Sequence, residues 1–222
     1  MPLLFNPLFI VKKLQIEKFK KYSGYLLGRV LDVGSGTAGF GRYLPEGTDY
    51  IGMDEFINVG PDILGKAQDL PFGEEAFDSI ICTEVLEHLP EPQHALIEMK
   101  RVLKKEGFLY LTVPQEWCLH YEPSDYFRFT RYGIKYLLEK NGFKVLSIER
   151  IGGVFSLIGQ RISDVSWQLG RNCLKPLLGE SWAERISSVL VWVFLIFFYC
   201  LAKLGDGINK SDALGWAVLA KK

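Results

Sequence analysis

Residues 30–41 read VLDVGSGTAGFG, and this stretch decides the fold. It places Gly34, Gly36 and Gly39 in a GxGxxG spacing, directly after a short apolar strand signal. Glycines at this spacing allow a tight turn from a strand toward a helix, where backbone N–H groups can approach a polar ligand. We therefore expect a nucleotide-type turn at the carboxyl end of a strand, followed by a short helical stretch that ends at Pro45.

An acidic side chain, Asp32, stands two positions before Gly34, and residues 31–41 contain no Lys or Arg. At the mouth of the turn its carboxylate would repel a pyrophosphate and attract a cation. Asp54 follows at the end of a second strand signal, DYIGMDEF, where an acid reaches ribose hydroxyls in this architecture. The pattern favours an adenosine ligand with a positively charged head group over a dinucleotide.

Strand and helix signals alternate beyond this turn, as they do in a doubly wound α/β sheet. We expect strands at 77–82, 108–114 and 143–151, an amphipathic helix over 91–107 with lysines in its last turn, and a helix over 130–142 capped by Thr130.

Five segments together resemble the class I S-adenosylmethionine-dependent methyltransferases of the small-molecule, type 11-like group. They are the glycine turn with its leading acid, Asp54, DLPF at 69–72, FDSIICTEVLEHL at 77–89 and RVLKKEGFLYLTVP at 101–114. The similarity covers residues 25–151. It implies a Rossmann-like seven-stranded sheet, methyltransferase activity and S-adenosylmethionine as the cofactor.

The resemblance also implies a set of cofactor-binding residues. Asp32, directly or through water, and the turn would hold the methionine part, Asp54 the ribose, and the backbone near residue 67 the adenine. Lys66 stands where many relatives have an acid, so either Asp69 makes the contact with the adenine amino group or that contact is absent. The predicted cofactor site consists of Asp32, Gly34, Ser35, Gly36, Asp54, Ala67, Gln68, Asp69, Leu70 and Glu84.

Candidate catalytic residues follow the fourth and fifth strands of the implied sheet. The loop CLHYEPSDYFRFT offers His120 as a base, Asp125 to orient it and Arg128 to bind an acidic or polyhydroxyl acceptor. An alternative is that Asp125 and Arg128 pair only with each other and fix the loop. His88 in EVLEHL either packs near the cofactor or takes part directly. The four cysteines show no metal-ligand spacing, and we expect no metal site.

Residues 152–212 are an insertion before the last strand, so the predicted division is 1–151, 152–212 and 213–222. The insertion has one apolar helical face from Val154 to Leu169, and residues 186–202 carry no charge. As a helix the second segment is ~25 Å long, short of the ~30 Å hydrocarbon core. A single crossing would also separate the last strand from its sheet. The options are contact with a membrane surface through 152–205, a lid over an apolar substrate, a homodimer interface or simple burial.

Composition limits the partners. Basic and acidic residues number 26 each, so no net charge draws the chain to nucleic acid. Three cysteines in apolar surroundings suggest buried thiols and a cytoplasmic location, and lysines from residue 12 to 21 suit the cytoplasmic face of an anionic membrane. The N-terminus is a poor signal peptide, since it lacks a basic leader and a cleavage site.

The function predicted from these observations is methyl transfer to a small-molecule or lipid-linked acceptor, at oxygen. One alternative is carbon methylation of a prenylated quinone, which the apolar insertion would serve equally well. Another is a subunit that binds S-adenosylmethionine without catalysis and uses the insertion as a protein interface.

Overall fold

The computed structural model describes residues 8–37, 39–208 and 211–222, and these form two compact units. The larger unit comprises Ile16–Glu149 and Gly215–Lys222. The smaller comprises Arg150–Leu214 together with Met1–Gln15, of which the structure describes residues 8–15. Residues 8–15 thus group with the helices of the insertion. Three pieces of the predicted segments lie outside the described residues. They are residues 1–7 of the N-terminal segment, residue 38 of the glycine turn and residues 209–210 of the insertion.

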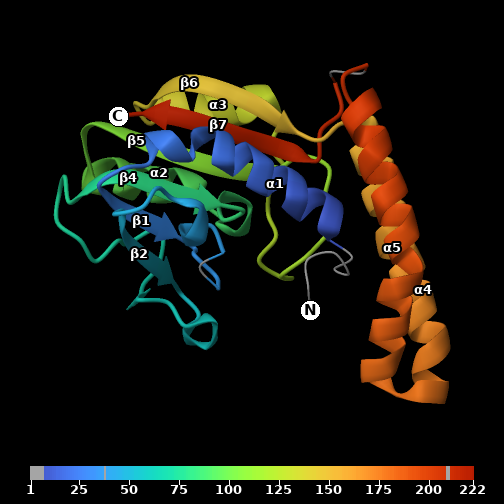
Figure 1. Ribbon diagram of the computed structural model, residues 1–222. Coiled ribbons are helices and arrows are strands. Elements are labelled where there is room, and N and C mark those ends of the chain that lie inside the picture. The colour runs from blue at the N-terminus through green and yellow to red at the C-terminus, as the bar shows by residue number, and fades with distance from the viewer. Residues whose placement is uncertain (1–7, 38, 209–210) are drawn as a thin grey trace. The chain divides into compact units, whose positions relative to one another are not determined.

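A seven-stranded sheet forms the centre of the fold, as predicted (Figure 1). Its strand order is β3-β2-β1-β4-β5-β7-β6, and β7 runs antiparallel to β5. The strands are β1 (Arg29–Val33), β2 (Asp49–Asp54), β3 (Ile63–Leu64), β4 (Phe77–Thr83), β5 (Leu103–Pro114), β6 (Lys144–Ile151) and β7 (Gly215–Lys221). Strand order reverses between β1 and β4, where a ligand crevice is expected at the carboxyl ends of the parallel strands.

The helices are α1 (Phe9–Tyr22), α2 (Pro92–Val102), α3 (Arg131–Lys140), α4 (Val154–Leu178) and α5 (Glu180–Gly205). Short 3-10 helices are η2 (Ser23–Tyr25), η3 (Gly41–Tyr43), η4 (Ile57–Val59) and η5 (Leu86–His88). Thr130 caps α3 as predicted, since its side chain accepts a hydrogen bond from the Gly133 N–H.

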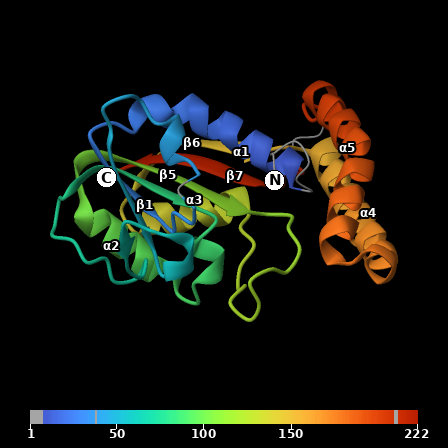
Figure 2. The same ribbon diagram turned by 60° about the horizontal axis from the view of Figure 1, so that its bottom comes forward.

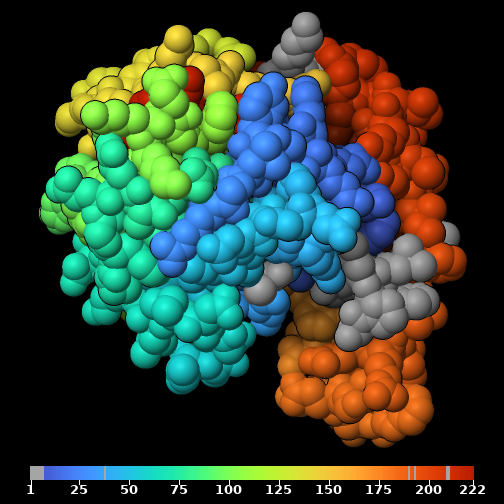
Figure 3. Space-filling view, turned by 60° about the vertical axis from the view of Figure 1, so that its left-hand side comes forward, coloured from blue at the N-terminus to red at the C-terminus, as the bar shows by residue number. Residues whose placement is uncertain are grey.

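Helices cover both faces of the sheet in the larger unit, with α1 on one face and α2 and α3 on the other (Figure 2). Phe19 and Tyr22 of α1 pack on Tyr110 of β5, with ring centroids 5.3 and 5.9 Å apart. Phe19 also contacts Phe40, so α1 lies beside the segment that follows the glycine turn (Figure 3). This half of α1 therefore stabilises the sheet by burying aromatic surface.

The short helical stretch predicted after the glycine turn is η3, which ends at Tyr43, before Pro45. One local prediction was wrong: the helix predicted over 91–107 ends at Val102. Leu103 adopts an extended conformation and pairs with Phe77, while Lys104 forms an ion pair with Asp78 at 2.7 Å. Burial of Leu103 in the sheet outweighs the helical propensity of the lysines.

The thiols are also more exposed than predicted. All four cysteines are free, and only Cys82 is buried. Cys173 and Cys200 lie in the helices of the insertion, and Cys118 lies in the loop after β5. Apolar sequence neighbours did not imply burial here, because the apolar faces of these helices are themselves exposed.

The insertion in the smaller unit is a hairpin of α4 and α5 that buries small and polar side chains. Ser156, Gly159 and Ser163 of α4 and Ser187 and Ser188 of α5 are all buried or packed against the other helix. A Cβ atom at Gly159 would lie 2.4 Å from Cβ of Phe198, so the helices approach closely at this point. The Trp167 indole N–H donates to the Ser188 hydroxyl at 3.1 Å.

Many of the larger apolar side chains of the hairpin are exposed, although Val191 and Leu195 of α5 are buried. On α4 the exposed ones are Ile158, Ile162, Val165, Leu169, Leu177 and Leu178, and on α5 they are Trp182, Val189, Phe194, Phe197 and Leu204. In the described part of the chain no single helix is long and apolar enough to span a membrane. Residues 180–189 and 194–205 pass the same test only as a pair, bent by 41°.

Candidate functional site

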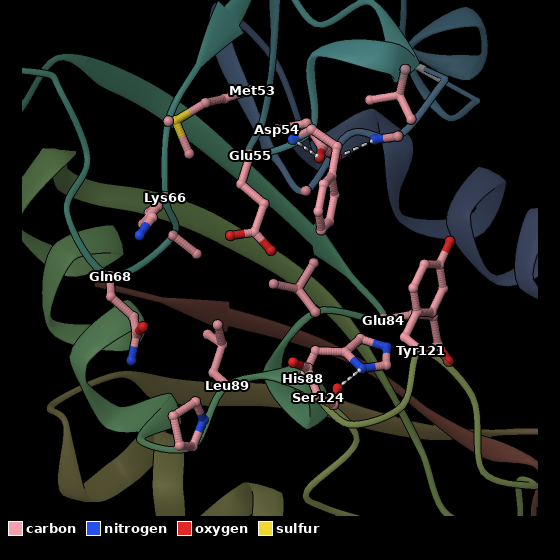
Figure 4. A pocket seen from close by; sticks show the side chains of 18 of the residues that line it. Met53, Asp54, Glu55, Lys66, Gln68, Glu84, His88, Leu89, Tyr121 and Ser124 are labelled. Atoms are coloured by element: carbon pink, nitrogen blue, oxygen red, sulfur yellow. Dashed lines mark hydrogen bonds between the residues drawn. The ribbon is translucent and has the colours of Figure 1, made fainter.

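A pocket of about 590 Å³ lies in the larger unit at the carboxyl ends of the parallel strands (Figure 4). The glycine turn after β1, the end of β2, the segment after β3, the residues after β4 and the loop after β5 all contribute to it. Its lining consists of Gly34, Gly36, Met53, Asp54, Glu55, Phe56, Val59, Gly65, Lys66, Ala67, Gln68, Glu84, Val85, His88, Leu89, Pro90, Tyr121, Glu122, Pro123, Ser124 and Tyr126.

The glycine turn has the backbone conformation that requires glycine at two positions. Gly34 has φ +71° and Gly36 has φ +52°, both in the left-handed region. A Cβ atom at Gly34 would lie 2.3 Å from Cγ2 of Val85, whereas a Cβ at Gly36 or Gly39 has no atom of another described residue, apart from its chain neighbours, within 4 Å. The Gly34 and Ser35 N–H groups donate to the Met53 carbonyl at 2.8 and 3.0 Å, which holds the turn against the end of β2.

Asp54 lies at the end of β2 and faces this turn. Its Oδ2 accepts a hydrogen bond from the Gly36 N–H at 2.9 Å, and its Oδ1 accepts one from the Phe56 N–H at 3.0 Å. Each carboxylate oxygen has a further lone pair, so Asp54 can still accept from hydroxyl groups in the pocket. This placement matches the ribose-binding role that the spacing predicted for it.

Asp32 does not lie at the mouth of the turn, contrary to our expectation. It is 1% exposed and is absent from the pocket lining, because it lies within β1 between Gly52 of β2 and Ile81 of β4. The Tyr50 hydroxyl donates to Asp32 Oδ2 at 2.8 Å, while Oδ1 has no hydrogen-bond partner among the described residues. Burial raises the pKa of Asp32 to about 7, and the negative charge of Asp54 adds to this.

Negative charge nevertheless dominates the pocket lining. It contains the four carboxylates of Asp54, Glu55, Glu84 and Glu122 and the single ammonium group of Lys66. Such a surface disfavours a pyrophosphate and favours a cation, which is the preference that the sequence suggested from Asp32 alone. The preference therefore arises from several side chains around the pocket.

Residues after β3 form one wall of the pocket. Ala67 and Gln68 line it as predicted, together with Lys66, and the exposed ring of Phe56 and Val59 supply apolar surface beside them. Asp69 and Leu70 lie outside the lining: Asp69 is exposed, and Leu70 is buried with its N–H donating to Glu98. The structure thus brings neither of these two predicted residues to the pocket.

The opposite wall comes from the residues after β4 and from the loop after β5. Glu84 and Tyr121 both line it and both have left-handed backbone conformations, with φ of +54° and +55° (Figure 4). Such conformations cost a non-glycine residue on the order of 1 kcal/mol and are concentrated at functional sites. The His88 ring also lines this wall, and its Nδ1 lies 2.6 Å from the Ser124 carbonyl oxygen.

The other three candidate catalytic residues lie behind this wall. The Asp125 carboxylate is 2% exposed and accepts two hydrogen bonds from the Arg128 guanidinium, at 2.6 and 2.7 Å. Arg128 also donates to the carbonyls of Trp117 and Cys118. These bonds lower the pKa of Asp125 and fix the loop, which corresponds to the structural alternative considered for this pair.

His120 connects this ion pair to His88. Its Nδ1 lies 3.3 Å from Asp125 Oδ2, and its ring contacts the His88 ring with centroids 4.6 Å apart. Burial lowers the pKa of His120, so the imidazole is neutral at pH 7. His88 is therefore the histidine that reaches the pocket, and His120 and Asp125 support it from behind.

Glu87 was not a candidate, yet it is the most unusual side chain near this wall. It is 0% exposed, and neither carboxylate oxygen has a hydrogen-bond partner among the described residues. Burial raises the pKa of Glu87 well above its usual value, and the negative charge of Glu84 raises it further. The Glu87 carbonyl accepts from the N–H groups of Tyr126 and Phe127, which attaches the loop to η5. The helical pattern LEH carried no signal for this burial.

Comparisons with known proteins match these features. Residues 31–111 match the model of a methyltransferase domain. An uncharacterised protein of Methanocaldococcus jannaschii, MJ1123, is 33% identical over 109 residues, which cover 47% of this chain and 52% of that protein. The chloroplastic 2-methyl-6-phytyl-1,4-hydroquinone methyltransferase 1 of rice (Oryza sativa subsp. japonica) is 29% identical over 100 residues, which cover 40% of this chain and 28% of that enzyme.

Solved structures share the fold across nearly the whole chain. The [4+2]-cyclase SpnF superposes with a TM-score of 0.62 at 18% identity, covering 94% of this chain and 80% of that one. An S-adenosylmethionine-dependent methyltransferase from Archaeoglobus fulgidus superposes with a TM-score of 0.60 at 17% identity, and the match covers 95% of this chain and 94% of that one.

The residues present fit S-adenosylmethionine. Asp54 can accept from ribose hydroxyls, the segment from Lys66 to Gln68 with Phe56 can enclose an adenine, and the acidic lining suits a sulfonium and an ammonium group. The unpartnered Oδ1 of Asp32 lies in β1 directly before the glycine turn, where water could connect it to the ammonium group. Residues 31–111 therefore match a methyltransferase domain, and the chain has the fold of S-adenosylmethionine-dependent methyltransferases.

Proposed function

We propose that the chain transfers a methyl group from S-adenosylmethionine to an oxygen atom of a small-molecule or lipid-linked acceptor. The observation that carries this proposal is the position of His88 in the pocket wall across from Asp54 and Glu55 (Figure 4). A carbonyl oxygen can only accept, so His88 Nδ1, which faces the Ser124 carbonyl, carries the proton. Its Nε2 is then left as the proton acceptor.

This arrangement provides a base for a hydroxyl acceptor. The cofactor supplies an electrophilic methyl group on a sulfonium. The acceptor oxygen forms a bond to the methyl carbon as the carbon–sulfur bond breaks, the electron pair stays on sulfur, and the hydroxyl proton passes to His88. Enclosure by both walls aligns the reactants and excludes water, and the base contributes about 100- to 10,000-fold.

An assay with labelled cofactor tests this activity. Purified full-length chain is incubated with S-adenosylmethionine carrying a tritiated methyl group and with a panel of phenols, catechols and isoprenoid alcohols. We expect a labelled ether product, and we expect His88→Gln to lower kcat by about 100-fold or more without changing cofactor affinity. His94→Gln is the matched control, because His94 lies on α2 and pairs only with Glu91 at 3.0 Å. Equal loss in both variants would contradict the proposed base.

The hairpin of the smaller unit supports a lipid-linked acceptor. It buries five serines and glycines where α4 and α5 approach each other, together with Val191 and Leu195, and it exposes other isoleucine, leucine and phenylalanine side chains. A hairpin in water normally has the opposite arrangement, whereas small residues between helices with apolar residues outside suit a lipid environment. We accordingly propose that residues 152–205 contact the cytoplasmic face of a membrane and bring the domain to its acceptor.

Vesicle co-sedimentation tests the membrane contact. The full chain is mixed with phosphatidylcholine vesicles containing phosphatidylglycerol, and we expect it to sediment with them. A triple variant of the exposed α4 face, Ile158→Gln, Ile162→Gln and Leu169→Gln, should lose most of this binding. Ile97→Gln on α2 is the control, because Ile97 is also about half exposed and lies in the methyltransferase unit. An intact chain that stays in the supernatant would exclude membrane contact, and association in size-exclusion chromatography would then favour a homodimer interface.

A second candidate function is carbon methylation of a prenylated hydroquinone. The similarity to the rice enzyme, whose name states a methylphytylhydroquinone as substrate, favours this candidate. The same assay distinguishes the two candidates, because an ether product regains its hydroxyl on demethylation with boron tribromide whereas a ring methyl group does not change. Tight cofactor binding without any labelled product would instead indicate a binding subunit.

A further inference from the structure

Three side chains that could hold a metal ion converge at the pocket wall made by the residues after β4 and the loop after β5, here called the acceptor wall. Glu87 and His88 come from η5, and His120 comes from the loop after β5. One ligand atom of each lies within 4.8 Å of those of the other two. The Glu87 side chain is fully buried, while the two imidazoles are 19% and 24% exposed.

The two imidazoles offer lone pairs toward this cluster. Nδ1 of His88 faces the Ser124 carbonyl at 2.6 Å, and Nδ1 of His120 faces the Cys118 carbonyl at 3.1 Å. Since a carbonyl oxygen can only accept, both Nδ1 atoms carry hydrogen and both Nε2 atoms carry the lone pair. The Glu87 carboxylate has no donor among the described residues, and its Oε1 lies 3.9 Å from Nε2 of His88.

A buried carboxylate without a donor is costly, and a bound cation removes that cost. Two neutral imidazoles and one carboxylate are ligands that zinc and its first-row neighbours prefer, whereas magnesium and calcium prefer oxygen. Asp125 lies 3.3 Å from Nδ1 of His120, which is the outer carboxylate partner commonly found behind a metal-bound histidine. A tetrahedral ion with bonds of about 2.1 Å sets its ligands about 3.4 Å apart, so binding would draw the three side chains inward by about an ångström.

We propose that Glu87, His88 and His120 bind one divalent first-row transition-metal ion, of the class of Zn²⁺, Mn²⁺ or Co²⁺. Because His88 lines the pocket, an ion bound to its Nε2 could take an oxygen ligand such as a hydroxyl or catechol group of the acceptor. This role for the ion rests on the proposed function, and with the ion bound His88 is a ligand and no longer the base: a metal-bound hydroxyl loses its proton more readily, and the proton leaves to solvent. The binding of the ion itself does not depend on methyl transfer.

The proposal is tested with Co²⁺ as a spectroscopic probe. Full-length chain without a histidine tag is stripped with a chelator, dialysed and titrated with CoCl₂. We expect visible absorption bands that saturate at one ion per chain, and a higher melting temperature in the presence of the ion. Absence of a saturable spectrum, or an unchanged melting temperature with excess Co²⁺ and Zn²⁺, would overturn the proposal without the use of any variant.

Variants then locate the ion. Loss of an outer partner of a metal-bound histidine typically weakens metal binding about 10- to 100-fold, and we expect Asp125→Asn to weaken Co²⁺ binding within that range. Glu87→Gln and His120→Gln each remove a ligand and should weaken Co²⁺ binding more. His94→Gln, which removes an exposed histidine near Glu91, should bind as the unmodified chain does. Circular dichroism and S-adenosylhomocysteine binding show that each variant is folded. If both ligand variants are folded and retain the spectrum, the site is not the one proposed. A chain that binds Co²⁺ but methylates no acceptor keeps the metal site and loses the proposed function.

Discussion

The two walls of the pocket are built by different means. The cofactor wall, which consists of the glycine turn, Asp54 and the segment after β3, is made largely of backbone. The glycine turn is fixed by N–H bonds to the Met53 carbonyl, and the Asp54 carboxylate is fixed by the N–H groups of Gly36 and Phe56. The acceptor wall is a loop attached by side chains and by two bonds to the Glu87 carbonyl. A wall made by strand ends is determined by sheet register, whereas a loop wall depends on a few contacts that another sequence could replace. The difference predicts how each wall responds to mutation.

The largest effect should come from Gly34→Ala in the cofactor wall. The substitution places a Cβ 2.3 Å from Val85 Cγ2 at φ +71°, so the turn must move. Left-handed strain of about 1–2 kcal/mol and overpacking of about 1–3 kcal/mol should together weaken S-adenosylhomocysteine binding by about 100-fold, measured by calorimetry.

Gly39→Ala is the control for this comparison. Its φ is not in the left-handed region and a Cβ there meets no atom within 4 Å, so we expect binding within about 2-fold of the unmodified chain. Similar losses in both variants would mean that the turn is not held as described.

A smaller effect, confined to the acceptor wall, should follow Arg128→Lys. Lysine cannot reproduce the two bonds to Asp125 together with those to the carbonyls of Trp117 and Cys118. We expect kcat/KM for the acceptor to fall about 10- to 100-fold and the loop to be cleaved faster in limited proteolysis. S-adenosylhomocysteine affinity should not change. The exposed Arg131→Lys serves as the control, and weaker cofactor binding in Arg128→Lys would show that the two walls are coupled.

The same contrast explains which parts could be predicted from the sequence. The position of Asp54 follows from strand spacing, the doubly wound architecture follows from the alternation of elements, and the seven-stranded sheet follows from the resemblance. The placement of Asp32 depends on which face of β1 each residue occupies. A shift of the strand register by one residue moves a side chain from the pocket to the core. The loop beside Glu87 is attached by bonds from the N–H groups of Tyr126 and Phe127 to the Glu87 carbonyl, about 40 positions away in the chain, and local pattern carries no information on such contacts.

Asp32→Asn should change stability with a sign opposite to that of an ordinary carboxylate. The folded pKa of about 7 lies above the unfolded value of about 3.9, so the free energy of unfolding falls as pH rises from about 4 to 7 and is then constant. The amide has no such titration. We expect the variant to be more stable than the unmodified chain by about 1–3 kcal/mol at pH 8 and to show no such gain at pH 4, measured by urea unfolding. A gain that is equal at both pH values would contradict the raised pKa.

At pH 4 the smallest change among these folded-state variants should come from Tyr50→Phe, which removes the hydroxyl that donates to Asp32 Oδ2. At pH 4 Asp32 is protonated, and the loss should be that of a neutral hydrogen bond, about 0.5–1.5 kcal/mol. At pH 8 the carboxylate is ionised, and the bond is charge-assisted, so the loss should rise to about 1.5–3 kcal/mol. In the Asp32→Asn background this dependence on pH should disappear, because the acceptor no longer titrates. Tyr50→Phe lowers the free energy of unfolding by the same amount at both pH values in both backgrounds if the hydroxyl stabilises β2 through packing. In that case the dependence of stability on pH does not arise from the bond between Tyr50 and Asp32.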